Sequence, residues 1–589
     1  MIPRGPVRVF SARRPGPASG EGISMMKRFL LIAAVLVIAF SASAALAAEK
    51  IAVDKTHFPD DAFRGYVKQF DLNADGYLSG AEREKVKKIS MSYGEDLTGV
   101  EHFTALEELR CEGAGLKELD ISKNTRLKTL NVRGNELTKL DLKNNRALTE
   151  IRCDHNRLTA LDLSACPGLK SLNCGQNALK KLDLSGCKAL TDLACGNNQM
   201  TALDVSGCGD LQELECVGCG LKSLKLPSGK KLRSVICMGN ALTTLDVSGC
   251  GGLKELSCDD NKLSALDLKA NKALQFLTCS RDPLTALDVT NNTALSELTC
   301  PGCGLKALDL TNNGALTRLN CSDNALTNLN VNKCPKLTWL DARNNRLVRI
   351  RLTENKKLTD ANVMLGGNGR RLTAEAGRIF LKDLGLAASA MTDVKGADKN
   401  STFLTVQKSG KVTYDYKVRG GLKVTFTLDV TYKKGELSSV TGAEDKYPYT
   451  GKAVKPAVTV KSKIAGRTVK LTKNVHYKVY YKNNVIPGTA TITVKGMGHF
   501  TGTLTKTFKI TKVKLGALTL SKTVMKYTGH EVKPGVKVTA KVNGQTVTLE
   551  KGVDYSVKYT NNIKKGTATV TVTGIGNFTG TLTKKFTIK

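Results

Sequence analysis

The chain has 589 residues, a formal net charge of +36 and an aromatic content of only 5%. Its length excludes a single hydrophobic core and indicates several domains. The position of the basic residues along the chain says more about function than the total charge does.

The N-terminal segment has the pattern of a secretory signal. Met25 or Met26 begins a basic stretch, an apolar run extends from Phe29 to Phe40, and a small-x-small site lies at 45–47. Because the run is short for a membrane span, residues 1–47 are interpreted as a leader and a signal peptide. A retained anchor helix is the alternative. No later segment predicts a membrane span, so a secreted or cell-surface bacterial protein is expected.

Residues 71–82 carry oxygen-bearing side chains at the spacing of a calcium loop. Gly76 stands at position 6, where the backbone turns sharply. The segment resembles an EF-hand loop, and helices are predicted on both sides, over 59–70 and 81–89. Residues 48–99 would then form an EF-hand-like N-terminal cap, unless the loop is degenerate and serves only as a turn. The resemblance implies Ca2+ as cofactor and the ligands Asp71, Asn73, Asp75, Tyr77, Ser79 and Glu82.

A 21-residue repeat then continues without insertion from Cys111 to Ala342. Its pattern, Leu-x-x-Leu-x-Leu-x-x-Asn-x-Leu with Cys at the third apolar site, resembles the leucine-rich-repeat family. The resemblance implies a mainly β solenoid of about twelve coils over residues 100–355. Each repeat divides into two similar halves, so two strand stacks per coil are possible. The main concave sheet is predicted on the half that contains Leu-x-Cys.

All seventeen cysteines occupy repeat positions that face the inside of such a solenoid. Ten stand at the third apolar site of the strand, and seven replace the asparagine of the turn. They are predicted to pack as small apolar side chains, with disulfides and metal binding as alternatives. The remaining turn asparagines are expected to bond the backbone of adjacent coils.

The outward side chains of the predicted strands form the candidate ligand face. Leucine-rich repeats commonly bind through this sheet, which implies a protein or glycan ligand on a cell surface. A solvated face without a ligand is the alternative. The second half-repeat carries a row of aspartates, which are expected to accept hydrogen bonds from turn amides. The candidate ligand-binding residues are Asp192, Glu213, Glu215, Glu255, Asp259, Phe276, Glu297 and Trp339.

Beyond the repeats the sequence becomes strand-rich and basic. Residues 356–440 are predicted to form a C-terminal cap, with a helix over 373–386 and a hairpin around Arg419–Gly421. A 78-residue repeat follows in 441–511 and 512–589, and it resembles the immunoglobulin-like modules of bacterial surface proteins, which implies two β-sandwiches.

The C-terminal modules carry most of the charge, because residues 447–589 contain 26 Lys or Arg and three acidic residues. This excess favours an anionic cell-wall polymer as a partner. Alternatively, the lysines serve solubility and block edge pairing of strands.

No residue set in the sequence indicates an enzyme. The six histidines lie at no metal-ligand spacing, and no phosphate loop or nucleophile motif occurs. No nucleic-acid motif occurs either, so nucleic acid is not an expected partner. Two functions remain: a secreted or cell-surface adhesion protein that binds through its repeats, or a structural cell-wall or matrix protein that binds anionic polymers through its basic modules.

Overall fold

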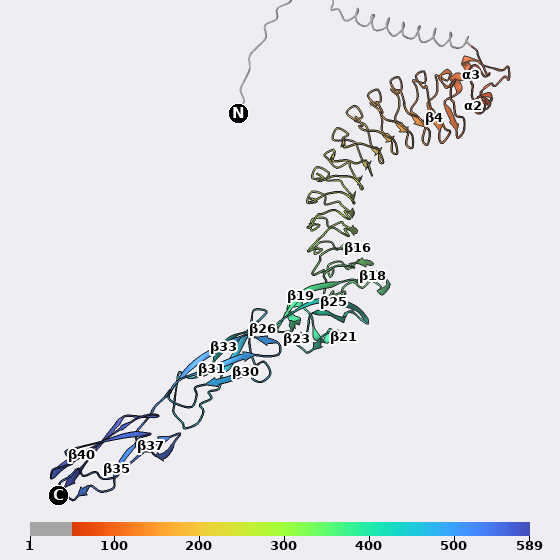
Figure 1. Cartoon of the computed structure of the whole chain (residues 1–589). Coiled ribbons are helices and arrows are strands. Elements are labelled where there is room, and N and C mark those ends of the chain that lie inside the picture. The colour runs from red at the N-terminus through yellow and green to blue at the C-terminus, as the bar shows by residue number, and fades with distance from the viewer. Residues whose placement is uncertain (1–49) are drawn as a thin grey trace, which may run out of the picture. The chain divides into compact units, whose positions relative to one another are not determined.

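The computed structural model describes residues 50–589 and divides them into two compact units (Figure 1). The first unit contains the described residues up to 345 together with 351–365, and the second contains 346–350 and 366–589. The predicted leader and signal peptide lie outside the described residues. Within residues 50–589, no helix has the length and apolarity that crossing a membrane requires.

A small helical region begins the first unit. The Asp60 carboxylate accepts a hydrogen bond from the Phe63 amide at 2.6 Å and caps the first helix. Ser79 and Glu82 form a reciprocal capping box at the second. The helical elements are α2 (Asp61–Val67), the 3-10 helix η1 (Lys68–Phe70), α3 (Gly80–Lys85) and the 3-10 helix η2 (Val100–His102).

The second predicted helix is shorter than expected. Helix α3 ends at Lys85, and the prediction that it continues to residue 89 is wrong. Residues Lys88–Met91 instead form strand β3, in which exposed and buried side chains alternate. This strand pairs in parallel with the first strand of the repeats, so the solenoid sheet begins inside the region predicted as a cap.

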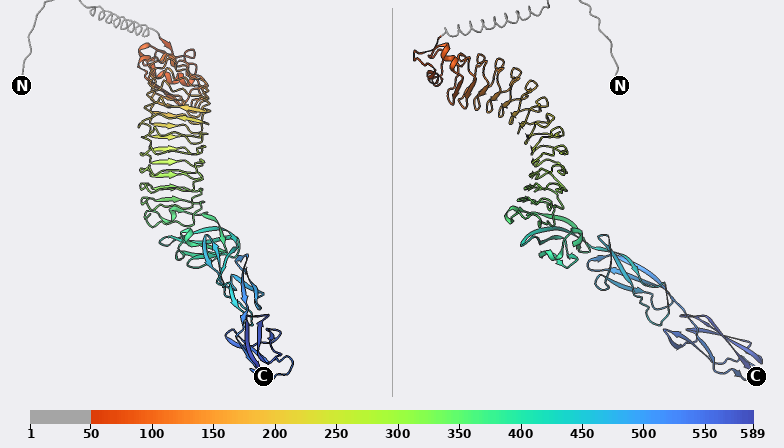
Figure 2. Two further views of the ribbon diagram at one scale, coloured as in Figure 1. Left: turned by 90° about the vertical axis from the view of Figure 1, so that its left-hand side faces the viewer. Right: turned by 180° about the vertical axis from the view of Figure 1, so that it is seen from behind.

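Fourteen parallel strands stack into one sheet in the first unit. Neighbouring strands within the repeats pair 21 residues apart, as Leu193 does with Leu214. Figure 1 shows the strands on the inner side of the curved stack, and Figure 2 shows them as one ladder. The strands are β3 (Lys88–Met91), β4 (Glu108–Cys111), β5 (Thr129–Asn131), β6 (Glu150–Arg152), β7 (Ser171–Asn173), β8 (Asp192–Ala194), β10 (Glu213–Glu215), β12 (Ser234–Ile236), β13 (Glu255–Ser257), β14 (Phe276–Thr278), β15 (Glu297–Thr299), β16 (Arg318–Asn320), β17 (Trp339–Asp341) and β18 (Val363–Met364).

The sheet uses the half-repeat that contains Leu-x-Cys, which confirms the prediction. The other half-repeat forms strands in two coils of the described chain, where β9 (Ala202–Asp204) pairs with β11 (Ser223–Lys225). Elsewhere its aspartates accept hydrogen bonds from turn amides as expected; Asp120, for example, accepts from Ser122 N at 2.8 Å. The mainly β solenoid is therefore confirmed, and it extends past both ends of the predicted range 100–355.

The interior of the solenoid is built from leucine and cysteine. All seventeen cysteines are buried with free thiols, which confirms their predicted packing position. Burial raises the pKa of Cys153 and of Cys321 to about 12. These thiols therefore stay protonated and act as small apolar side chains.

A ladder of buried or partly buried asparagines closes the turn after most strands of the solenoid. Asn261 is representative: its Nδ2 donates to Cys237 O at 3.1 Å and to Cys258 O at 2.9 Å, while its Oδ1 accepts from Leu242 N at 3.0 Å. One side chain thus satisfies backbone groups of two neighbouring coils, as the sequence predicted.

One position of this ladder holds an acid. Asp282 is fully buried, and its Oδ1 accepts from Leu263 N at 2.9 Å in the manner of the asparagines. Its Oδ2 takes the place of the Nδ2 donor of the asparagines. Within residues 50–589, this oxygen has no hydrogen-bond partner. Burial, the largest cause, raises the pKa of Asp282 to about 6.

The second unit begins with a seven-stranded sheet of order β21-β24-β25-β19-β20-β23-β22. The predicted hairpin is confirmed, because β24 and β25 pair antiparallel around a turn at Gly420. The strands are β19 (Gly369–Glu375), β20 (Arg378–Phe380), β21 (Met391–Lys395), β22 (Asp398–Lys399), β23 (Phe403–Thr405), β24 (Gly410–Arg419) and β25 (Leu422–Lys433), with the 3-10 helices η3 (Asp360–Asn362, in the first unit), η4 (Leu381–Leu384) and η5 (Ala388–Ala390).

The predicted helix over 373–386 is wrong. Ala376 and Gly377 adopt positive φ values of 50° and 67°, which turns the chain between β19 and β20. Strand β19 then pairs along its whole length with β25. Seven sheet pairings to a strand 58 residues away outweigh the local helix preference of Ala, Glu and Arg.

The basic C-terminal region repeats its strands 78 residues apart, as β30 and β39 do. In the first repeat, the strands of two four-stranded sheets contribute to one core that includes Val460, Ile492 and Phe508. Strand β26 belongs to this repeat although it begins before residue 441, because it pairs with β28. The strands are β26 (Gly435–Thr441), β27 (Lys446–Pro448), β28 (Thr459–Ile464), β29 (Arg467–Lys470), β30 (Tyr477–Lys482), β31 (Gly488–Gly496), β32 (Phe500–Thr501) and β33 (Thr503–Thr511).

The second repeat has its own core, which includes Val538, Val570 and Phe586. Its strands are β34 (Val513–Lys514), β35 (Ala517–Leu520), β36 (Val524–Met525), β37 (Val536–Val542), β38 (Gln545–Thr548), β39 (Tyr555–Thr560), β40 (Gly566–Gly574), β41 (Phe578–Thr579) and β42 (Thr581–Ile588).

Candidate functional site

Most three-residue strands of the solenoid present their outer two residues on the sheet face and bury the middle one. In β10, Leu214 is buried while Glu213 and Glu215 are exposed. The same geometry places Asp192, Glu255 and Glu297 on this face. The predicted aromatic residues Phe276 and Trp339 also lie on it.

Asp259 is the exception among the predicted ligand-face residues. The expectation that it points outward is wrong, because it follows the end of β13 and is only 9% exposed. Its carboxylate accepts hydrogen bonds from Ser280 N at 2.8 Å and Ser257 Oγ at 3.1 Å, and another from Thr278. Asp259 therefore holds the turn of two coils together.

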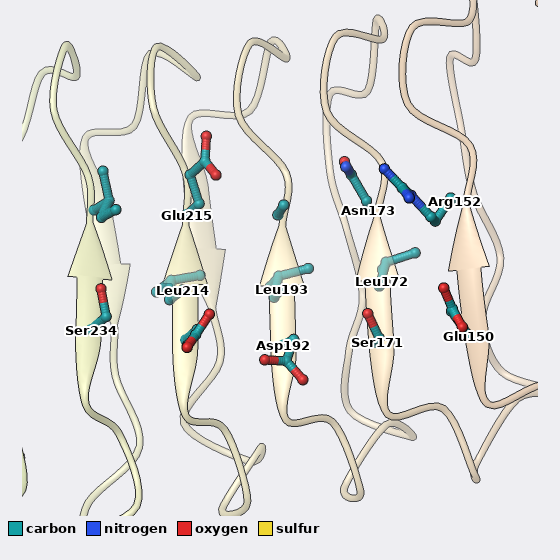
Figure 3. A pocket seen from close by; sticks show the side chains of 13 residues that line it. Glu150, Arg152, Ser171, Leu172, Asn173, Asp192, Leu193, Leu214, Glu215 and Ser234 are labelled. Atoms are coloured by element: carbon teal, nitrogen blue, oxygen red, sulfur yellow. The ribbon is translucent and has the colours of Figure 1, made fainter. Parts of the chain in front are cut away.

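The acidic residues of β8 and β10 line a hollow in the sheet face (Figure 3). Its volume is about 330 Å³, and Ser171, Asn173 and Ser234 contribute polar groups beside the carboxylates. Sequence analysis missed Glu150, which also lines the hollow. Glu150 occupies the strand position of Asp192 two coils earlier, so the 21-residue register identifies it.

Among the described residues that line the hollow, Arg152 is the only basic one, and it forms no ion pair with the acids of β8 and β10. Elsewhere on the solenoid, acids pair with bases of the next coil, as Glu107 does with Lys128 at 2.6 Å and Asp204 with Lys225 at 3.0 Å. In the described chain no such ion pair involves Asp192, Glu213 or Glu215. Asp192 and Glu213 face each other directly across β8 and β10, an arrangement in which like charges repel.

The aromatic end of the face lies three to six coils beyond Glu213. Phe276 is 42% exposed between Glu255 and Glu297 in the same row. The guanidinium of Arg318 stacks over the Trp339 ring at 4.2 Å from its centroid, on the adjacent strand. The face therefore combines an acidic hollow with one free aromatic ring and one covered by a cation.

The predicted calcium loop has the backbone of a tight oxygen-lined turn. Gly76 has a φ of +81°, and its amide donates to Asp71 Oδ2 at 2.8 Å. The Asp75 amide donates to Asn73 Oδ1 at 3.1 Å, and Leu78 at position 8 is buried. The side chains at positions 1, 3 and 5 thus gather around the turn, while Tyr77 offers its carbonyl and Ser79 its hydroxyl. This oxygen-only donor set fits a hard cation such as Ca2+.

The carboxylates of this loop are engaged by protein groups. Glu82 is 7% exposed and accepts from Leu72 N and Ser79 N, each at 2.8 Å. Burial acts to raise the pKa of Glu82, but these hydrogen bonds and that of the Ser79 hydroxyl lower it overall. A hydrogen bond from Lys50 lowers the pKa of Asp75. Within residues 50–589, no three His, Cys, Asp or Glu side chains converge as a ready-made metal site.

A parallel solenoid with 21-residue coils, a leucine and cysteine interior and an asparagine ladder has the architecture of the leucine-rich-repeat fold. The solved structures similar to this chain include a functional domain of InlJ from Listeria monocytogenes, described as including a cysteine ladder. That similarity has a TM-score of 0.45 and 26% identity, and it covers 66% of this chain and 99% of the InlJ domain.

Two further similarities have lower identity. An internalin, inlF of Listeria monocytogenes, is 20% identical with a TM-score of 0.45, over 53% of this chain and 98% of that one. The effector YopM of Yersinia pestis is 24% identical with a TM-score of 0.40, over 52% and 82%. No family model and no curated protein matches the chain.

Proposed function

We propose that this is a secreted or cell-surface binding protein that recognises a protein partner through the concave sheet face. The observation that carries the proposal is the hollow lined by Asp192, Glu213 and Glu215, whose carboxylates form no ion pair in the described chain even though Arg152 also lines the hollow. A partner that supplies Lys or Arg side chains would relieve their repulsion and gain charge-assisted hydrogen bonds.

The rest of the face supports the same proposal. Phe276 is an exposed aromatic side chain of the kind that anchors protein interfaces. It lies on the same regular sheet as the hollow, so a partner can contact both without rearrangement of the solenoid. A cell-surface glycan is the alternative ligand, and such a ligand would depend more on Phe276 and less on the carboxylates.

The test replaces the three carboxylates in the full chain: Asp192→Asn, Glu213→Gln and Glu215→Gln. Proteins captured from cell-surface extracts by the unmodified chain are identified, and their Kd is measured for both forms. We expect at least about a tenfold weaker Kd, together with a strong dependence on salt. The matched control is Asp204→Asn with Asp210→Asn, two carboxylates that already pair with lysines. Equal affinity of the triple variant would exclude this face.

We further propose that the loop 71–82 binds Ca2+ and stabilises the N-terminal cap. Its oxygen donor set and its turn at Gly76 support this role. Extracellular modules of this kind bind Ca2+ with a Kd of roughly 0.1–1 mM. Calcium is expected to raise the unfolding temperature of the protein, and Glu82→Gln is expected to abolish the increase. No change of the unfolding temperature with millimolar Ca2+ would contradict the proposal.

A second candidate function is binding of an anionic cell-wall polymer by the C-terminal modules, which we propose to be immunoglobulin-like. The charge of residues 447–589 favours it. Residues 513–589 contain 13 Lys or Arg and three acids and have their own set of buried core residues, with Tyr449 packed against both this core and the preceding one, so the truncation leaves the buried residues of the preceding core in place. The amount of protein that sediments with purified anionic wall polymer should decrease on this truncation and when salt is added. Unchanged sedimentation would contradict this function.

A further inference from the structure

We infer that Lys50 is a tethered cation that competes with Ca2+ for the loop 71–82, an inference that rests on the proposed calcium binding. Strand β1 (Ile51–Ala52) pairs antiparallel with β2 (Tyr77–Leu78), the strand inside the loop. The Val53 amide extends the pairing by donating to Gly76 O at 2.9 Å. The N-terminal strand is thereby held along the loop and brings Lys50 beside it.

The ammonium group of Lys50 is hydrogen-bonded to the Asp75 carboxylate, which a Ca2+ ion in the loop would need as a ligand. Its Nζ donates to Asp75 Oδ2 at 2.6 Å and lies 5.8 Å from the centroid of the Tyr77 ring. Asp75 is the residue at position 5 of the loop. Because a Ca2+ ion coordinated by Asp75 would repel the ammonium at this distance, both cations cannot hold the carboxylate together.

Glu82 is engaged in a similar way on the other side of the loop. Its Oε1 accepts from Leu72 N and its Oε2 from Ser79 N, so its carboxylate is already satisfied. A bidentate ligand at position 12 would have to give up the bond from Leu72. The loop therefore has a stable arrangement held by the protein's own groups, and binding of Ca2+ exchanges these contacts for metal–oxygen bonds.

Two consequences follow from this exchange. Calcium affinity is lower than the donor set alone would provide, because Lys50 must leave Asp75. Calcium binding also frees the Lys50 side chain from Asp75. The residue that precedes β1 therefore loses its contact with the loop when the loop holds Ca2+. An exposed ion pair of this type is expected to weaken calcium binding by about two- to fivefold, with the larger effect at low salt.

The experiment measures metal binding by the full chain and by Lys50→Met, which removes the charge and keeps the aliphatic stem. Terbium is titrated with excitation of Tyr77, and Ca2+ is then used to displace it. Lys50→Met is expected to bind Ca2+ about two- to fivefold more tightly. Lys55→Met is the matched control, since Lys55 is an exposed lysine of the same segment that lies near Asp61 and not on the loop. The Glu82→Gln variant gives the background terbium luminescence of a chain whose loop does not bind the ion.

A second measurement follows Lys50 itself. Its rate of acetylation by a water-soluble ester, read by peptide mass spectrometry, is expected to rise when Ca2+ is added, while that of Lys55 stays constant. Equal Ca2+ affinity of Lys50→Met and the unmodified chain would overturn the competition and leave calcium binding intact. Absence of terbium and Ca2+ binding in both forms would instead refute the calcium site, and the inference with it.

Discussion

Asp282 is the acidic residue in a ladder whose other described members are asparagine or, at Cys219 and Cys303, cysteine. Asparagine donates a hydrogen bond to carbonyls at the equivalent places, as Asn261 does. An ionised Asp282 would direct a negative oxygen at such carbonyls without a donor, whereas the neutral acid can donate its proton. Its surroundings do not offset this, because Asp259 and Asp260 raise the pKa further and Arg281 is exposed and paired with Asp260.

The pH dependence of stability follows from the raised pKa. Asp282 keeps its proton to about pH 6 when folded, but loses it near 3.8 when unfolded. The folded chain thus binds more protons between these values, so the free energy of unfolding falls as pH rises from about 4 to about 6 and stays low above. We expect Asp282→Asn to remove this part of the pH dependence and to stabilise the protein at pH 8 by about 1–3 kcal/mol.

Denaturation of both forms at pH 5 and pH 8, with hydrogen exchange of residues 258–303, checks the prediction. Asp210→Asn serves as the control, since that carboxylate is exposed and paired with Lys231. A loss of stability in Asp282→Asn at pH 8 would show that the acid makes a favourable contact as an anion.

At the scale of the element, each asparagine of the ladder joins its own turn to the preceding coil, as the bonds of Asn261 show. Asn261→Ala removes three donated bonds, to Cys237 O, Cys258 O and Asp259 O, and leaves Leu242 N without its acceptor. We expect a loss of about 2–4 kcal/mol, concentrated in the adjoining coils, because buried backbone groups become unsatisfied. Asn312→Ala is the control, since this exposed side chain makes one bond to Thr290 O. Hydrogen exchange should increase around residues 237–263 in the first variant alone.

Elements that depend on short-range periodicity were predictable, and those that depend on distant partners were not. The 21-residue register located the strand triplets, the cysteines and the grouping of Asp192, Glu213 and Glu215, because each coil repeats its neighbour. It could not reveal that residues 369–375 pair with β25, which lies 58 positions away and overrides a helical preference.

The same limit applies to the candidate sites. The oxygen residues of the calcium loop are adjacent in sequence, so their pattern was visible. The contact of Lys50 with Asp75 depends on the pairing of β1 with β2, across 25 residues, and carries no local signal. Asp259 was misplaced because the strand ends at Ser257, and a two-residue alternation does not show where a strand ends.

At the scale of the whole molecule, the free thiols offer a direct measure of the integrity of the solenoid. All seventeen are buried, which keeps reagents away from the sulfur atoms. Burial raises the pKa of Cys153 and Cys321 to about 12, whereas hydrogen bonds with Cys195 and Cys279 lower the pKa of Cys219 and Cys303. In the native protein at pH 8, we expect less than about one equivalent of thiol per chain to react with an aromatic disulfide reagent within minutes. In denaturant all seventeen should react. Rapid reaction of several thiols in the native state would show that the coils open readily.

The uniform length of the coils also affects how the gene can change by gain or loss of whole repeats. Since each coil ends in the same geometry in which the next begins, a duplication or deletion of 21 codons changes the length of the solenoid without disturbing its register. Recombination between neighbouring repeats can therefore move an acidic hollow or an aromatic residue along the array one coil at a time. Such a gene can alter what its product recognises by exchanging whole coils, while the leucine and cysteine interior that holds the protein together stays the same.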